Sequence, residues 1–136
     1  MLQGAGALLV VVGAIHLAIT PHLMRWLSHN LTARAYAETG PASMLNHVVV
    51  GVLLIPLGLT TAFAAGPAQE GARWAFAVEL VNALAVLAMP ATLFFTVTGP
   101  MLRAPAFVVA MALLAVASVA LLVAVFALRP RTASPA

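Results

Sequence analysis

Four long apolar runs alternate with short polar stretches along the 136 residues of the chain. The runs cover about residues 4–20, 44–65, 74–97 and 106–128. A helix needs roughly 20 residues to cross the hydrocarbon core of a bilayer, and its backbone groups must be satisfied within the segment. The pattern therefore predicts an all-α integral membrane protein with four transmembrane helices. Their short connections favour an antiparallel four-helix bundle.

The stretch that follows the first run has a different pattern. Between residues 21 and 31, apolar side chains recur at spacings of three and four, while histidine and arginine occupy another face. The apolar positions are Leu23, Trp26, Leu27 and Leu31. This pattern is typical of an amphipathic helix that lies on the membrane surface. Because proline often ends or bends a helix, Pro21 predicts either an end of the first span near Thr20 or a kink there, and 21–31 is expected to be an interfacial segment.

Composition supports the membrane assignment. Hydrophobic residues make up 64% of the chain and charged residues 7%, whereas soluble domains carry about 25% charged residues. The first apolar run has no positively charged region before it, which predicts a retained span rather than a cleaved signal peptide. We therefore expect a single transmembrane domain over 1–136, with a polar tail at 129–136.

The residue types exclude several classes of function. The chain has no cysteine, which removes thiolate metal sites, and all six basic residues are arginine, which removes lysine chemistry. The net charge of +3 is scattered, so nucleic acid is not an expected partner. No catalytic motif is present and no motif links the chain to a known family, so a non-catalytic protein is favoured over an enzyme.

The arginines say little about orientation. If the four runs cross the membrane in turn, three arginines fall on each side, so the positive-inside rule barely discriminates. We expect a multi-pass protein of the cell (inner) membrane with both termini in the cytoplasm.

Two of the four histidines differ from the others. His22 and His29 belong to the amphipathic stretch and are expected to face water or lipid headgroups. His16 and His47 each lie four residues inside the expected membrane boundary, a depth of about 6 Å at the rise of an α-helix. Two antiparallel helices would therefore present these two rings at the same depth.

Glycines support an approach of these two helices. Gly6 and Gly13 share a side of the first run with His16, and Gly51 and Gly58 share a side of the second with His47. Small residues at such spacings mark places where membrane helices come close together. We expect both rings to point into the bundle.

His16 and His47 have three candidate roles. They can hydrogen-bond across the bundle and hold helices together, they can ligate a haem or another tetrapyrrole, or they can form a metal, quinone or proton-relay site. The cofactor is therefore unknown, with haem or another tetrapyrrole as one candidate. Close packing argues against haem, because a macrocycle needs helices that are held apart.

Glu79 and Asn82 are the polar candidates of the third run, and they enter the membrane from the side opposite the histidines. An intramembrane carboxyl is a functional candidate by default. The structural alternative is that Glu79 reaches toward the boundary and pairs with Arg73 or an arginine of the tail. Because Glu79 enters from the opposite side of the membrane, its position argues against a site shared with His16 and His47.

These observations favour a non-catalytic accessory or structural subunit of a larger membrane complex. It would contact the lipid bilayer and either other membrane subunits or a second copy of itself. The first alternative is a haem-, pigment- or metal-binding electron-transfer protein that uses His16 and His47. The second is a small transporter or membrane enzyme that uses Glu79.

Overall fold

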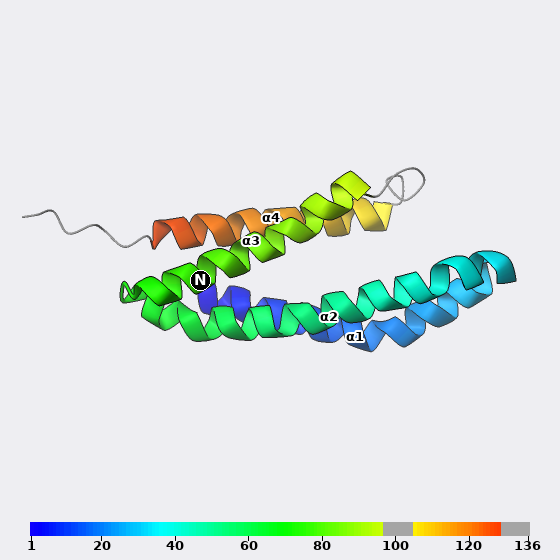
Figure 1. Cartoon of the computed structure of the whole chain (residues 1–136), viewed down its shortest axis with the longest axis horizontal. Helices are drawn as coiled ribbons and strands as arrows, with labels where there is room; N and C mark the ends of the chain where they lie inside the picture. Colours follow the sequence, from blue (N-terminus) through cyan, green and yellow to red (C-terminus); the bar gives the residue numbers. More distant parts are fainter. Residues whose placement is uncertain (97–104, 129–136) are drawn as a thin grey trace, which may run out of the picture. The chain divides into compact units, whose positions relative to one another are not determined.

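The computed structural model describes residues 1–96 and 105–128, and every regular element in these ranges is an α-helix (Figure 1). The helices are α1 (Leu2–Asn30), α2 (Ala33–Gln69), α3 (Arg73–Thr96) and α4 (Pro105–Ala127). The predicted all-α class is thus confirmed. The predicted polar tail, 129–136, lies outside the described residues.

Three helices are long and apolar enough to cross a membrane. They are α1, α2 and the segment Arg73–Thr92 of α3, and the segment Leu114–Ala127 of α4 is a shorter apolar helix. These lengths and compositions are those of a membrane protein.

The end of α1 differs from the sequence-based expectation. The helix continues through Pro21 to Asn30, so residues 21–30 are its last turns rather than a separate segment. Proline lacks an N–H and leaves the carbonyl of Leu17 without its helical donor, a loss that membrane helices tolerate. Side chains then bond back to carbonyls near the end of the helix: Ser28 and His29 donate to the Arg25 carbonyl, at 2.8 and 2.7 Å. These side chains therefore bond within the last turns of α1.

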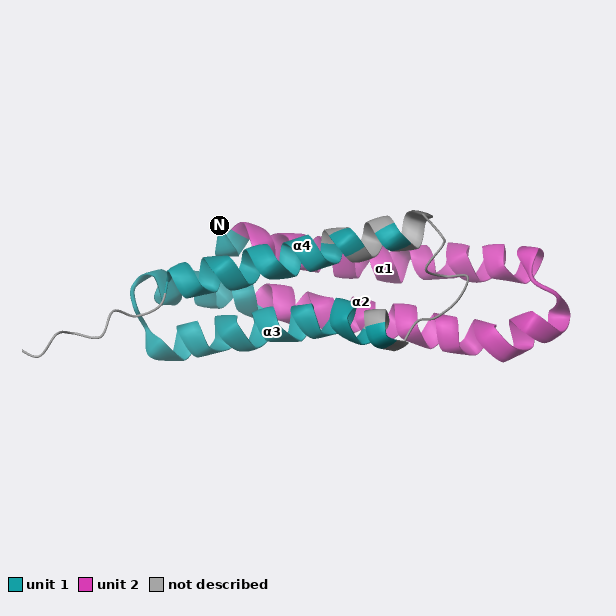
Figure 2. Cartoon of the chain, turned by 90° about the horizontal axis from the view of Figure 1, so that it is seen from above, with its two compact units in different colours: residues 1–3, 60–136 teal, residues 4–59 magenta. Residues whose placement is uncertain are grey.

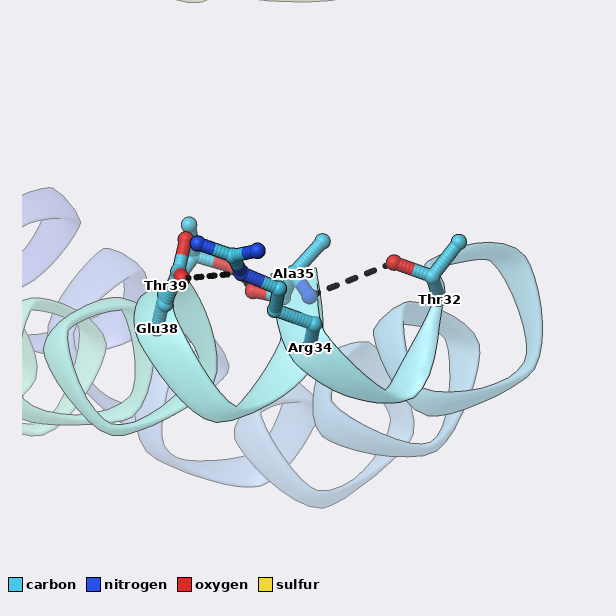
Figure 3. A network of polar contacts seen from close by, with 5 residues as sticks. All are labelled: Thr32, Arg34, Ala35, Glu38 and Thr39. Carbon is cyan, nitrogen blue, oxygen red and sulfur yellow. Dashed lines mark hydrogen bonds and ion pairs between the residues drawn. The ribbon is translucent and has the colours of Figure 1, made fainter.

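The start of α2 also differs, because the helix begins at Ala33 rather than near residue 44. Thr32 caps it by accepting a hydrogen bond at Oγ1 from the backbone N–H of Ala35, at 3.2 Å (Figure 3). One turn further on, Arg34 and Glu38 form an ion pair at 3.0 Å between two exposed side chains. Thr39 donates to the Ala35 carbonyl at 2.7 Å. These local bonds support helix in a stretch that reads as a polar loop in the sequence.

Both helices are longer than one membrane crossing requires. With 29 residues, α1 is about 43 Å long, and with 37 residues, α2 is about 55 Å long. The hydrocarbon core of a bilayer is about 30 Å thick. Each helix is therefore longer than a single upright crossing of the hydrocarbon.

The chain divides into two compact units, and α2 contributes to both (Figure 2). Unit 2 consists of residues 4–59, which form most of α1 and the first part of α2. Unit 1 consists of residues 1–3 and 60–136, which include the end of α2, α3 and α4.

The two helices of unit 2 run antiparallel and touch through glycine. A Cβ atom built on Gly13 would lie 2.8 Å from the carbonyl oxygen of Gly51, and one built on Gly58 would lie 2.7 Å from the backbone nitrogen of Val10. Both distances are shorter than real contacts of a Cβ atom. The backbones of α1 and α2 therefore meet directly, as small residues allow in membrane proteins.

Unit 1 is held by small side chains. Ala64, Ala68 and Ala75 form a buried cluster between the end of α2 and the start of α3, with Leu128 packed against it. The connection between these helices contains Gly71, whose φ of 86° lies in the left-handed region that glycine tolerates. The N–H of Gly71 donates to the Ala68 carbonyl and that of Ala72 to the Pro67 carbonyl, which is the bonding pattern of a Schellman cap.

Candidate functional sites

The rings of His16 and His47 lie next to each other in unit 2. Their centroids are 5.2 Å apart and their planes are inclined by 31°. Nδ1 of His16 donates to the Val12 carbonyl of its own helix at 3.1 Å. Nδ1 of His47 is buried and has no hydrogen-bond partner. The two imidazoles therefore have different environments although they touch.

The glycine contact explains why the rings meet. Gly13 and Gly51 bring the two backbones together; His16 lies three residues after Gly13, and His47 lies four residues before Gly51. In antiparallel helices, a forward step along one chain and a similar backward step along the other lead to nearly the same height. The spacing of the glycines thus places the histidines opposite each other.

Thr20 and His16 both use their polar side chains within α1. Oγ1 of Thr20 donates to the backbone carbonyl of His16 at 2.7 Å, so this hydroxyl serves its own helix. His16 also bonds within its own helix, at Val12. The two rings therefore form a direct contact between α1 and α2.

The geometry restricts which cofactors the pair can hold. A metalloporphyrin with both imidazoles as axial ligands would have to stand between the two rings. The backbone contact of Gly13 with Gly51, one turn away, leaves no space for a macrocycle there. A single metal ion binds an imidazole nitrogen at about 2 Å and needs no such space. Among the described residues, no group of three or more His, Cys, Asp or Glu side chains is placed to hold a metal.

His22 and His29 are both exposed. Nδ1 of His29 is bonded to the Arg25 carbonyl, and the two histidines are separated by seven residues, about 10 Å along the helix. They form no common site with each other.

Glu79 has an unusual environment in unit 1. Its side chain is 0% exposed, and neither carboxyl oxygen has a hydrogen-bond partner. Arg73 is exposed and forms no ion pair with it in the described part of the chain. The expected pairing of Glu79 with Arg73 is therefore not observed. The arginines of the tail lie outside the described residues.

Asn82 lies one turn after Glu79 and links α3 to α2. Its Nδ2 donates to the hydroxyl oxygens of Thr60, at 2.9 Å, and of Thr61, at 3.0 Å. Asn82 is 6% exposed and Thr61 is 0% exposed, whereas Thr60 is exposed, so the network reaches from the interior of unit 1 to its surface. We name the four residues Glu79, Asn82, Thr60 and Thr61 the polar cluster.

Sequence reasoning missed the two threonines. The adjacent pair Thr60–Thr61 interrupts the apolar run of α2 and lies eight or nine residues before its end at Gln69. Asn82 lies nine residues after the start of α3 at Arg73. Counting from the turn between the helices would have placed these side chains at the same height.

Ser118 shows the contrasting case of a buried polar group that needs no other helix. It is 0% exposed, and its Oγ donates to the carbonyl of Leu114 on the preceding turn of α4, at 2.7 Å. Its hydrogen bond lies within α4 and does not link helices.

The two candidate sites lie in different units, with the histidine pair in unit 2 and the polar cluster in unit 1. No protein-family model matches the chain, and no curated protein or solved structure was found to be similar to it. The function is therefore argued from the residues and their geometry.

Proposed function

We propose that this chain is a non-catalytic accessory or structural subunit of a larger complex in the cell (inner) membrane. Its four helices pack as one antiparallel transmembrane bundle in this proposal. In this role the protein contacts lipid on one side and packs on another side against a neighbouring membrane subunit or a second copy of itself.

The observation that carries this proposal is the outward face of α1. The face turned to α2 carries glycine, whereas the opposite face carries large apolar side chains that are 45–56% exposed. These side chains are Leu8, Val11, Ile15 and Ile19. The exposed Ala14 and Ala18 lie between them at a spacing of four. Small residues between large apolar side chains are typical of surfaces on which membrane helices pack against each other. A surface that contacts only lipid does not need small residues at such positions.

Photo-crosslinking tests this contact. A photoreactive amino acid at Ala14 should give one defined crosslinked product in native membranes, and the same amino acid at Val81, which is exposed on α3, serves as the control. The substitution Ala18→Leu should suppress the product from position 14, because it fills the gap between Ile15 and Ile19. Crosslinks to lipid alone, or equal products from positions 14 and 81, would refute a subunit contact on α1.

The proposed topology has a test of its own because the chain has no cysteine. Single cysteines at Ser28, near the end of α1, and at Gln69, at the end of α2, lie on opposite sides of the membrane in the proposed bundle. With both termini in the cytoplasm, a membrane-impermeant maleimide should label Ser28→Cys in intact cells and Gln69→Cys only after permeabilisation. Labelling of both cysteines from one side would contradict the bundle.

The 5.2 Å approach of His16 and His47 supports a second candidate function, the binding of a metal such as copper by both imidazoles. A haem or another pigment could be ligated by one imidazole from outside the α1–α2 contact. Purified protein would then contain metal or absorb visible light, and His16→Ala and His47→Ala would each abolish the signal. A colourless, metal-free preparation that still forms the crosslink from position 14 would exclude cofactor binding and support the subunit role.

A further inference from the structure

Glu79 is the buried group that the proposed function does not use. Its side chain is 0% exposed, and both carboxyl oxygens are without a hydrogen-bond partner. An ionised carboxylate in such surroundings needs a cation or several donors, since the loss of its hydration is otherwise very unfavourable.

The elements around Glu79 supply no cation among the described residues. Residues 60–69 of α2 contain no charged or histidine side chain, and the same holds for residues 105–128. On α3 the nearest charge is Arg73, which is exposed and six residues away, and Glu70 in the preceding turn is exposed as well. The amino group of Met1, which belongs to unit 1, is exposed too.

The neighbours on the next turn provide polarity without charge. Asn82 lies three residues after Glu79, so the two side chains share a face of α3. The amide nitrogen of Asn82 lies between the hydroxyl oxygens of Thr60 and Thr61 and donates to both. The partly positive NH₂ group of the Asn82 amide therefore lies between the two hydroxyl oxygens. A metal cation that used these oxygens as ligands would have to occupy the same position.

We propose that the polar cluster of unit 1 is a proton-binding site within the membrane, in which the carboxyl of Glu79 takes up and releases the proton. In the protonated state Glu79 is neutral, as its apolar burial requires, and Asn82 lies three residues further on the same face of α3. This inference goes beyond the proposed subunit role, and the contact surface of α1 has no part in it.

Infrared spectroscopy can observe this proton directly because the chain has only three acidic side chains. The full chain in liposomes at neutral pH should show the carbonyl band of a protonated carboxylic acid, with a shift in D₂O. Glu79→Gln should remove the band, whereas Glu38→Gln and Glu70→Gln, at exposed positions, should retain it. Raising the pH should remove the band reversibly in wild type. Absence of the band in wild type, or its persistence in Glu79→Gln, would overturn the proposal.

A membrane-soluble carbodiimide gives an independent measurement. The carboxylic O–H adds across the carbodiimide: the oxygen bonds to the central carbon and the proton moves to one nitrogen. Acyl migration to the other nitrogen then leaves an N-acylurea, so the mass rises by one whole reagent molecule. Peptide mass spectrometry should find this adduct on Glu79, with less of it at high pH and with no effect of sodium ions. Protection by sodium at constant pH would show that the site binds a metal cation and would overturn the proposal.

Two controls keep these results separate from misfolding and from the subunit role. Glu79→Gln replaces the carboxyl by a group of similar shape, and its circular dichroism and elution volume should equal those of wild type. The crosslink from position 14 should also form in Glu79→Gln, since α1 carries it. Loss of the infrared band and of the adduct in this folded variant is the expected result, and their retention would refute the assignment to Glu79.

Discussion

Units 1 and 2 join their helices in different ways. In unit 2 the backbones of α1 and α2 come into close contact at Gly13, Gly51 and Gly58, where a Cβ atom would not fit. In unit 1 small alanines set the spacing, and Asn82 adds hydrogen bonds from α3 to α2. Lipid tails are as apolar as the side chains, so apolar burial alone drives little helix association in a membrane. The two units therefore rely on the two remaining sources of attraction, close packing and interhelical hydrogen bonds.

The largest effect is expected where the backbones meet. Gly58→Ala should destabilise the protein by about 1–3 kcal/mol, because the added methyl would lie 2.5 Å from the Gly6 carbonyl oxygen. The matched controls are Gly4→Ala and Gly66→Ala, which meet no atom within 4 Å. These should be stabilising by about 0.4–1 kcal/mol, since alanine restricts the unfolded chain. Equilibrium unfolding in mixed micelles measures both, and equal effects at the three positions would refute the backbone contact.

The hydrogen-bonded contact of unit 1 should be the next most sensitive. Asn82→Ala removes two bonds, each worth about 0.6 kcal/mol on average in a membrane protein, so a loss of about 1 kcal/mol is expected. Thr61→Val should cost less, because Thr60 still accepts from Asn82. In the double variant the two losses should not add. Additive losses in the same unfolding assay would mean that Asn82 and Thr61 stabilise unit 1 independently.

His47 should behave in the opposite way from Asn82. Its buried Nδ1 has no partner, so His47→Leu removes an unsatisfied polar group and should leave stability unchanged or raise it by about 1 kcal/mol. The stability of metal-free protein, measured with and without added copper or zinc, tests this. A clear loss in the metal-free variant would show that the ring pair itself holds α1 to α2.

The smallest effect is expected at the start of α2. Arg34→Ala breaks the ion pair with Glu38, but the two side chains are 90% and 63% exposed, and such pairs contribute little. No measurable change in stability is expected at physiological salt. A substantial loss, or a loss that persists at high salt, would mean that Arg34 contacts something other than Glu38.

The sequence alone predicts that the protein consists of membrane helices and that two of its histidines lie close together. The apolar runs predict membrane helices because only helices satisfy backbone groups in lipid. The heptad spacing of Gly6 and Gly13 predicts a contact face that also carries His16, and the rings do meet.

The continuity of α1 and α2 was harder to predict. Pro21 was expected to end or bend a helix, yet one missing N–H is a small loss in a helix of 29 residues. In α2 the sequence predicts a span that starts near residue 44, but the helix already includes Gly40 and Pro41. The ring of Tyr36 covers Gly40, where a Cβ atom would lie 3.1 Å from the ring. Single-residue propensities do not include such a contact between successive turns.

The 37 residues of α2 form one uninterrupted helix that supplies both units. His47 and Thr61 are separated by 14 residues, which is close to four whole turns, so they lie on nearly the same side of α2 and about 21 Å apart. Gly51, Leu54 and Gly58 occupy that side between them and are buried. One helix therefore uses a single side for two kinds of contact, with a histidine ring at one position and an asparagine amide at the other.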